Sequence, residues 1–350
     1  MTNGFAMSAD SSLRSPSMSS PDSAPKSLQS PGSPDEATVR KQWQPLILLL
    51  LTAALVLRII AAVAVDRYVH GQGRQFLIEG DANGYWELGR RLAAGDEYAI
   101  HTPPRYVLRM PGFPLLLAGC IRVFGDNILP ARMVLAVAGT FCCWLTLQLG
   151  RRLHMTRTGF WAALYVAVHP LHVGTSVIIL SETWFSLWML LSLLAFVWLL
   201  DEHVAGGNSP APTALPTACR LQNGCVCPYR LTFRSFLCGC AIGLSVLVRP
   251  GFLPWLMIAA LGILLLLKRS LLLRFVLCGT LISGCLLMLL PWAVRNHGVT
   301  GQWVFTSLWS GPSLYDGLNA QATGASDMDF FDEENVMSRM TEYEMNEHYK

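Results

Sequence analysis

The sequence predicts an all-α polytopic membrane protein that crosses the bilayer about seven times. Hydrophobic residues make up 52% of its 350 residues and charged residues only 14%, whereas about a quarter of the residues of a soluble protein are charged. The apolar residues are concentrated in long runs, which is typical of spanning helices. The net charge of +3 is small and scattered along the chain, so no nucleic-acid partner is expected.

Each spanning helix needs about 20 apolar residues to cross about 30 Å of hydrocarbon. The fifth of the apolar runs is short, and Arg249-Pro250-Gly251 marks a tight turn or a broken helix where it ends. The predicted spans are 44–65, 130–149, 158–180, 182–200, 236–249, 250–267 and 272–293.

The apolar run 111–124 is too short to span and contains Arg122, so we expect an interfacial or re-entrant helix there. With this run at the surface, four basic groups fall on one side of the membrane, which is the cytoplasmic side under the positive-inside rule. These groups are Arg40-Lys41, Arg151-Arg152-Arg157, Arg220-Arg230-Arg234 and Lys268-Arg269-Arg274.

This orientation divides the chain into three parts. Residues 1–38 are a Ser/Pro-rich cytoplasmic tail that we expect to be disordered, because it cannot bury enough apolar surface. Residues 39–293 form the transmembrane module, with an external loop at 66–129 and a cytoplasmic insertion at 201–235. Residues 294–350 are an external C-terminal segment, either the start of an external domain or a truncated end.

Cysteine and histidine give no metal site in this interpretation. Most of the ten cysteines lie in apolar spans, as small core residues do. Cys219, Cys225 and Cys227 lie in the predicted insertion, and their spacing matches no common zinc pattern. His169 and His172 flank Pro170, so a helix kink with hydrogen-bonded histidines is favoured over a metal pair.

The first external loop contains the main candidate for catalysis. Asp81 precedes an amphipathic segment in which Tyr85, Leu88 and Leu92 recur at helical spacing, and Gly95 is expected to end that helix. A carboxylate at the membrane surface can accept a proton from an attacking hydroxyl or amine. Asp is also a favoured residue at the N-cap of a helix, so the spacing alone leaves both roles, general base and N-cap, open.

Four further residues are candidates for binding substrate. Arg109 begins the second surface helix, where it could bind phosphate oxygens or simply meet lipid headgroups. Glu182, Arg249 and Arg295 lie at the predicted external ends of spans. Ionisable residues there often line a functional cavity, although Glu182 could cap a helix and the two arginines could snorkel.

These motifs, in this order, resemble the GT-C membrane glycosyltransferases, in particular the family 39-like group that includes protein O-mannosyltransferases and the aminoarabinose transferase of lipid A. The resemblance covers about 44–325 and rests on several short motifs. They are Asp81 with Tyr85, Arg109-x-Pro111-Gly112-x-Pro114, Ser181-Glu182-Thr183, Arg249-Pro250, Pro291-Trp292 with Arg295-Asn296, and Gly311 to Tyr315.

The resemblance implies a GT-C-like helix bundle and an inverting sugar transfer at the external face of a bacterial inner (plasma) membrane. The donor would be a polyprenyl-phosphate sugar and the acceptor a protein, lipid or glycan, with no cofactor, nucleotide or obligatory metal. Asp81 would be the base. Arg109, with Arg249 and Arg295, would bind the donor phosphate, and Tyr85 and Glu182 would contact substrate.

Two other functions remain open from the sequence. Broken spans such as the one at Arg249-Pro250-Gly251 are common in transporters and flippases, although no symmetry between two halves is visible. A non-catalytic membrane scaffold is the third possibility. Walker, GxGxxG, GxSxG and HExxH motifs are all missing from the sequence, which argues against nucleotide hydrolysis and the common hydrolase mechanisms.

Overall fold

The computed structural model describes residues 36–201, 228–319, 322, 324 and 339–350. The chain divides into two compact units, Met1–Pro45 and Leu46–Lys350. Residues 1–35 of the predicted tail lie outside the described residues. So do residues 202–227 of the predicted insertion, with its three cysteines.

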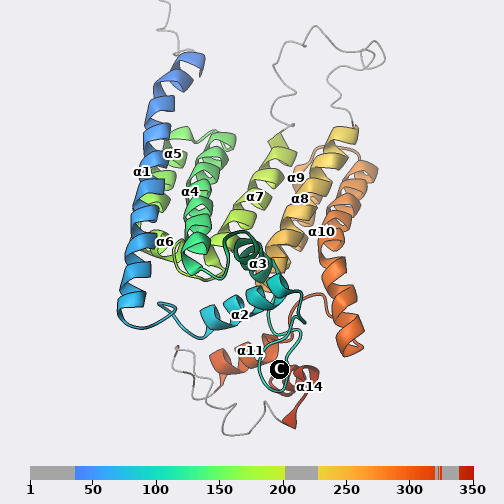
Figure 1. Cartoon of the computed structure of the whole chain (residues 1–350). Coiled ribbons are helices and arrows are strands. Elements are labelled where there is room, and N and C mark those ends of the chain that lie inside the picture. The colour runs from blue at the N-terminus through green and yellow to red at the C-terminus, as the bar shows by residue number, and fades with distance from the viewer. Residues whose placement is uncertain (1–35, 202–227, 320–321, 323, 325–338) are drawn as a thin grey trace, which may run out of the picture. The chain divides into compact units, whose positions relative to one another are not determined.

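Helices make up nearly all the regular structure of the described residues (Figure 1). The long helices are α1 (Glu36–Gly71), α4 (Ile128–Arg152), α7 (Glu182–Leu200), α8 (Pro228–Val248) and α10 (Leu271–Thr300). The shorter ones are α2 (Asp81–Ala94), α3 (Gly112–Phe124), α5 (Thr156–Val168), α6 (Pro170–Thr175), α9 (Pro254–Leu266), α11 (Ser310–Leu318) and α14 (Glu342–His348), with a 3₁₀ turn η3 at Pro250–Phe252. An isolated antiparallel bridge pairs Ile100 with Arg105.

Five helices of the described chain are long and apolar enough to cross a membrane. The predicted count of seven is not confirmed, because two predicted spans are not long continuous helices. Pro170 divides 158–180 into α5 and α6, since proline has no N–H to continue the helix. Pro250 and Pro254 likewise leave η3 and the 13-residue α9 within 250–267. The fifth predicted span, 236–249, is longer than expected, because α8 begins already at Pro228.

The tightest helix contact joins α8 to α10. Gly239 and Gly243, one turn apart on α8, lie against the backbone of α10, and a Cβ on Gly243 would lie 2.8 Å from the carbonyl oxygen of Cys285. Small residues spaced by four let two helices approach closely where lipid offers no hydrophobic driving force. This contact fixes the C-terminal end of α8, which borders the site described below, relative to α10.

Arg58 of α1 is fully buried at the break between α5 and α6. Its guanidinium donates to the carbonyl oxygens of Val166 at 2.8 Å and Ala167 at 3.0 Å, at the end of α5. It therefore satisfies carbonyls that the helix break leaves without their usual N–H partners. The predicted kink is confirmed, but the predicted hydrogen bonding is not complete, because Nδ1 of His169 is buried without a partner among the described residues.

The two predicted surface helices, α2 and α3, pack against each other. Trp86 of α2 is buried in a core shared with α3 and donates to Asp126 at 3.1 Å. Gly95 ends α2 as predicted, in the left-handed conformation with φ 85°. Asp81 is the first residue of α2 but makes no capping hydrogen bond, so the N-cap interpretation is wrong.

The ends of the helices form two groups (Figure 1). α2, α3, α6, α11 and α14 lie at one end of the bundle. The α4–α5 and α9–α10 connections and the start of α8 lie at the other, and they contain the described residues of three of the four predicted basic groups. This grouping agrees with the single basic side predicted from the sequence.

Candidate functional site

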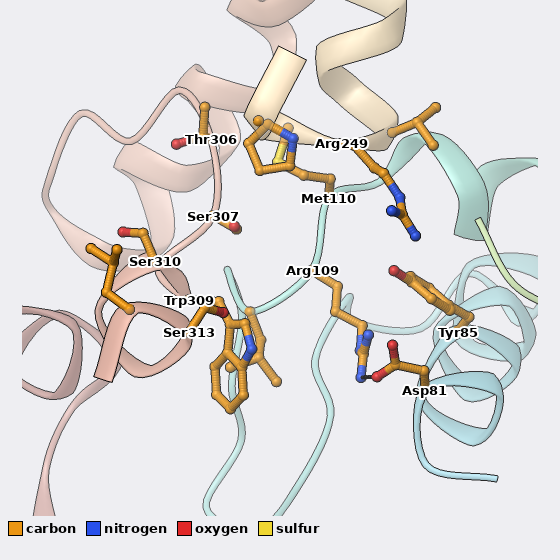
Figure 2. A pocket seen from close by; sticks show the side chains of 15 residues that line it. Asp81, Tyr85, Arg109, Met110, Arg249, Thr306, Ser307, Trp309, Ser310 and Ser313 are labelled. Atoms are coloured by element: carbon orange, nitrogen blue, oxygen red, sulfur yellow. Dashed lines mark hydrogen bonds and ion pairs between the residues drawn. The ribbon is translucent and has the colours of Figure 1, made fainter. Parts of the chain in front are cut away.

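A pocket of about 650 Å³ opens where α8 ends. Four segments line it: the first turn of α2, the loop segment 108–110, the turn 248–251 after α8, and the segment 306–314 (Figure 2). Four of the six predicted site residues line this pocket, namely Asp81, Tyr85, Arg109 and Arg249. The other two, Glu182 and Arg295, are not among its lining residues.

Asp81 and Arg109 form an ion pair on one side of the pocket (Figure 2). Nη2 of Arg109 lies 2.7 Å from Oδ1 of Asp81, whose side chain is 62% exposed, whereas the Arg109 side chain is only 21% exposed. Burial lowers the pKa of Arg109, but Asp81 and Tyr85 raise it more, so the pKa lies above its ordinary value. The guanidinium is therefore a permanent cation that faces an accessible carboxylate.

Tyr85 and Gly84 fix the position of the Arg109 guanidinium. Its central carbon lies 4.6 Å from the centroid of the Tyr85 ring, within cation–π range. The Tyr85 ring in turn packs edge-on against Phe113 of α3 at 5.1 Å. On α2, a Cβ added to Gly84 would lie 3.0 Å from Nε of Arg109. Gly84 thus leaves the room that the arginine needs against α2.

Arg249 follows the last residue of α8 and is held by the start of α7. Its Nη2 lies 2.5 Å from Oε1 of Glu182, and its Nε donates to Oγ of Ser181 at 3.1 Å. Glu182 therefore contacts the pocket through Arg249. Its other oxygen, Oε2, is buried without a hydrogen-bond partner among the described residues.

Arg295 lies on α10, outside the pocket lining. Its guanidinium donates to the carbonyl oxygens of Tyr106 at 2.6 Å and Tyr98 at 2.7 Å. Through these two bonds, Arg295 fixes the loop that precedes Arg109.

Tyr98 continues this connection towards the pocket. Its hydroxyl donates to the carbonyl oxygens of Arg109 at 3.1 Å and Met110 at 3.3 Å, and its ring packs edge-on against Trp292. Burial raises the pKa of Tyr98 well above its ordinary value, so the hydroxyl stays a donor. The backbone that carries Arg109 is therefore fixed from α10 through Tyr98.

Across the pocket from the ion pair lies the segment 306–314 (Figure 2). The backbone of this segment is fixed at two points: Leu308 N donates to Val107 O at 3.0 Å, and Trp292 Nε1 donates to Thr306 O at 3.1 Å. The sequence did not predict that this segment forms a wall of the pocket. Its signals were the motif from Gly311 to Tyr315 and a run of hydroxyl-bearing residues after the last span, and neither predicts what the segment faces.

The helix α14 holds both this segment and the loop before Arg109. Oδ1 of Asn346 accepts from Oγ of Ser310 at 3.0 Å and from Gly311 N at 2.9 Å. Glu342, only 7% exposed, accepts from Val107 N at 3.0 Å. Residues near the end of the sequence thus complete the pocket formed by the first loop.

Within the described ranges, no three His, Cys, Asp or Glu side chains come together in a way that could hold a metal ion. Asp81 is followed by the buried Ala82. The polar groups gathered at the pocket are therefore one ion pair, a second arginine and a set of hydroxyls.

The fold is similar to that of a solved oligosaccharyltransferase. AglB from Archaeoglobus fulgidus, solved in complex with an inhibitory peptide and a dolichol-phosphate, matches with a TM-score of 0.50 at 14% identity, over 89% of this chain and 36% of that one. The apo crystal structure of the Archaeoglobus fulgidus oligosaccharyltransferase matches with a TM-score of 0.45 at 13% identity, over 86% and 40% of the two chains. The chain thus spans well under half the length of these proteins.

The chain has the GT-C fold of membrane glycosyltransferases, as the sequence predicted. Within it, the family model described as dolichyl-phosphate-mannose-protein mannosyltransferase matches residues 104–206, from the loop before Arg109 to just beyond α7. No curated protein sequence matches the chain significantly.

Proposed function

We propose that this protein transfers a sugar from a polyprenyl-phosphate donor to an acceptor at the external face of the membrane. The observation that carries the proposal is the Asp81–Arg109 ion pair in one pocket with Arg249 (Figure 2). The matches to a mannosyltransferase family and to the GT-C fold support the same chemistry. So does the dolichol-phosphate bound to AglB, as a precedent in a protein of similar fold.

Arg109 and Arg249 are the proposed ligands of the donor phosphate. Arg249 follows directly after the apolar helix Tyr229–Val248, so it lies at the depth where a lipid phosphate meets the edge of the hydrocarbon. Arg109 gives only one of its five N–H groups to Asp81 and keeps others for phosphate oxygens. As the glycosidic bond breaks, negative charge grows on the phosphate, and these two fixed cations stabilise it.

Asp81 is the proposed general base. Its exposed carboxylate can take the proton of the attacking acceptor while Arg109 orients it. Attack from the side opposite the phosphate inverts the anomeric centre, as in one-step glycoside hydrolysis. Tyr85 borders this reaction space and packs on Arg109.

The two predicted residues outside the pocket have supporting roles in this proposal. Glu182 orients Arg249 and Arg295 orients the loop before Arg109, so neither needs to touch the donor. The pocket lies at the end of the bundle away from the described basic groups, which supports an external active site in a plasma membrane (Figure 1). A protein, lipid or glycan could be the acceptor.

The proposal can be tested with purified protein in liposomes that contain radiolabelled polyprenyl-phosphate mannose, glucose or aminoarabinose. Asp81→Asn should lower sugar transfer by about 100-fold or more, because it removes the base. Asp96→Asn is the matched control, since Asp96 is exposed in the loop after α2 and does not line the pocket.

The same assay distinguishes the transferase from a flippase and from a scaffold. Full transfer activity in the Asp81→Asn protein would remove Asp81 as the base. Movement of the donor lipid between leaflets without a covalent product would indicate a flippase. Donor binding without turnover by the unaltered protein would indicate a scaffold.

A further inference from the structure

The pocket has two chemically different walls. One carries the ion pair Asp81–Arg109 and Arg249, and the other is the segment 306–314 (Figure 2). From Gln302 to Tyr315 the sequence contains no Asp, Glu, Lys, Arg or His. An ionic group is therefore recognised on the first wall, while the second offers only neutral contacts.

Hydroxyl groups and one indole dominate the neutral wall. Thr306, Ser307, Ser310, Ser313 and Trp309 all line the pocket. Within the described part of the chain, the hydroxyls of Thr306, Ser307 and Ser313 make no hydrogen bond to another residue. These hydroxyls can both donate to and accept from a ligand that is itself rich in hydroxyls.

The neutral wall is formed before any ligand arrives. Trp309 packs at the edge of a core cluster that includes Leu308 and Trp292. Asn346 holds the first turn of α11 through Ser310 and Gly311. A preorganised indole beside hydroxyls matches the two surfaces of a sugar ring, whose C–H groups pack against an aromatic face while its hydroxyls form hydrogen bonds.

We propose that the segment 306–314 is the acceptor subsite and that the acceptor is an uncharged glycan. One sugar ring of the acceptor packs on Trp309, and its hydroxyls bind Ser307 and Ser313. This inference rests on the proposed function, because it assigns the opposite wall, with Arg109 and Arg249, to the donor phosphate.

The transfer step follows from this arrangement. An acceptor hydroxyl oxygen forms a bond to the anomeric carbon of the donor sugar. The bond from that carbon to the phosphate oxygen breaks, and its electron pair leaves with the lipid phosphate. The proton of the hydroxyl passes to the carboxylate of Asp81, which lines the same pocket as the neutral wall.

The experiment compares Trp309→Ala with a matched control, Trp303→Ala. Trp303 lies six positions earlier, is exposed, and stacks on His297 outside the pocket. The acceptor probes are maltotriose, cellotriose and mannotriose, with a Ser/Thr-rich peptide and an amine-bearing glycolipid for comparison. Transfer is measured in liposomes with the full chain, and trisaccharide binding without donor is measured by saturation-transfer NMR.

We expect a trisaccharide to bind and to accept sugar. Trp309→Ala should raise the acceptor KM by about tenfold and leave the donor KM within about twofold, while Trp303→Ala changes neither. Ser313→Ala, at an exposed position, should raise the acceptor KM in the same direction and serves as a second variant if Trp309→Ala fails to fold.

Two kinds of failure can be told apart. Transfer to the peptide or glycolipid with no binding of any trisaccharide would overturn the glycan acceptor while leaving the proposed function intact. The glycan acceptor would also be overturned if Trp309→Ala changed only the donor KM. If trisaccharides bind at Trp309 but no donor is consumed under any condition, the proposed transferase fails and the glycan-binding wall stands.

Discussion

Arg295 donates to the carbonyl oxygen of Tyr98 at 2.7 Å and so joins the last long helix to the loop that carries Arg109. The Tyr98 hydroxyl then donates to the carbonyl of Arg109 itself. An arginine that the sequence suggested as a phosphate ligand therefore has its donors directed at protein backbone. Its influence on the reaction is expected to pass through the position of Arg109.

Arg295→Lys should lower kcat about tenfold and leave the donor KM within about twofold. A lysine ammonium is a point charge and cannot bridge the carbonyls of Tyr98 and Tyr106 as the guanidinium does, so the loop before Arg109 loses its orientation. Steady-state kinetics with varied donor check this, with the exposed Arg230→Lys as control. A rise in donor KM at constant kcat would instead mean that Arg295 touches the phosphate.

Tyr98→Phe should destabilise the protein by about 0.5–1.5 kcal/mol, because it removes the hydroxyl that serves the carbonyls of Arg109 and Met110. The measurement is thermal unfolding in detergent. Tyr68→Phe removes a hydroxyl from an exposed tyrosine of α1 and should leave the melting temperature unchanged. Equal melting temperatures for the Tyr98 and Tyr68 variants would show that this hydroxyl contributes nothing to the fold.

Gly84→Ala should weaken donor binding although it favours the helix. A Cβ at position 84 would lie 3.0 Å from Nε of Arg109, so the guanidinium must shift by a few tenths of an ångström. Gly119→Ala in α3 is the matched control, because nothing lies within 4 Å of its added Cβ. Both variants gain up to about 1 kcal/mol of helix propensity.

The donor KM separates these two glycine variants. We expect a rise of about three- to tenfold for Gly84→Ala, roughly 1 kcal/mol of lost binding, and none for Gly119→Ala. Unchanged donor KM in both would show that the position of Arg109 against α2 does not limit donor binding.

Asp126 should make the protein sensitive to acid. Its carboxylate accepts hydrogen bonds from Arg90 and Trp86 of α2, and the bond from Arg90 is the main reason that its pKa lies below the ordinary value of 3.8. A carboxylate whose pKa is lowered by folding stabilises the fold fully above its unfolded pKa. That contribution is lost as the pH falls below 3.8 and through the folded pKa.

The Asp126→Asn variant tests this dependence. Because the Asp126–Arg90 pair is partly exposed, we expect it to contribute only about 0.2–1 kcal/mol. When the pH is lowered from 5 to 3, the free energy of unfolding of the unaltered protein should fall by this amount more than that of the Asp126→Asn protein. Chemical unfolding at each pH measures the difference. Parallel curves for the two proteins would contradict the prediction, and Asp96→Asn should follow the unaltered protein.

Local sequence patterns predicted the elements around the first loop. The spacing of Tyr85, Leu88 and Leu92 predicted α2, and Gly95 predicted its end, because helical periodicity and glycine caps depend on neighbours in the sequence. The meeting of Asp81 and Arg109 was also foreseeable, since both were placed in one loop at one membrane face.

Contacts between distant parts of the chain were not predictable in this way. The sequence did not show that Asp81 pairs with Arg109 rather than capping α2, because that depends on where Arg109 points. The role of Arg295 likewise depends on residues 189 and 197 positions away. Helical periodicity carries no information on such pairs. The break at Pro170 was visible, but nothing in the sequence near it identifies Arg58 as the side chain that satisfies the exposed carbonyls.

The bond between Glu342 and Val107 joins residues 235 positions apart in the sequence. During synthesis the first loop leaves the ribosome long before α14 does, so the wall that Asn346 holds can form only after the later helices have been made. A nascent chain inserted in the bilayer would thus contain Asp81, Arg109 and Arg249 for some time before the pocket around them is complete. The proposed reactivity towards lipid-linked sugars would then begin only after α14 has been made.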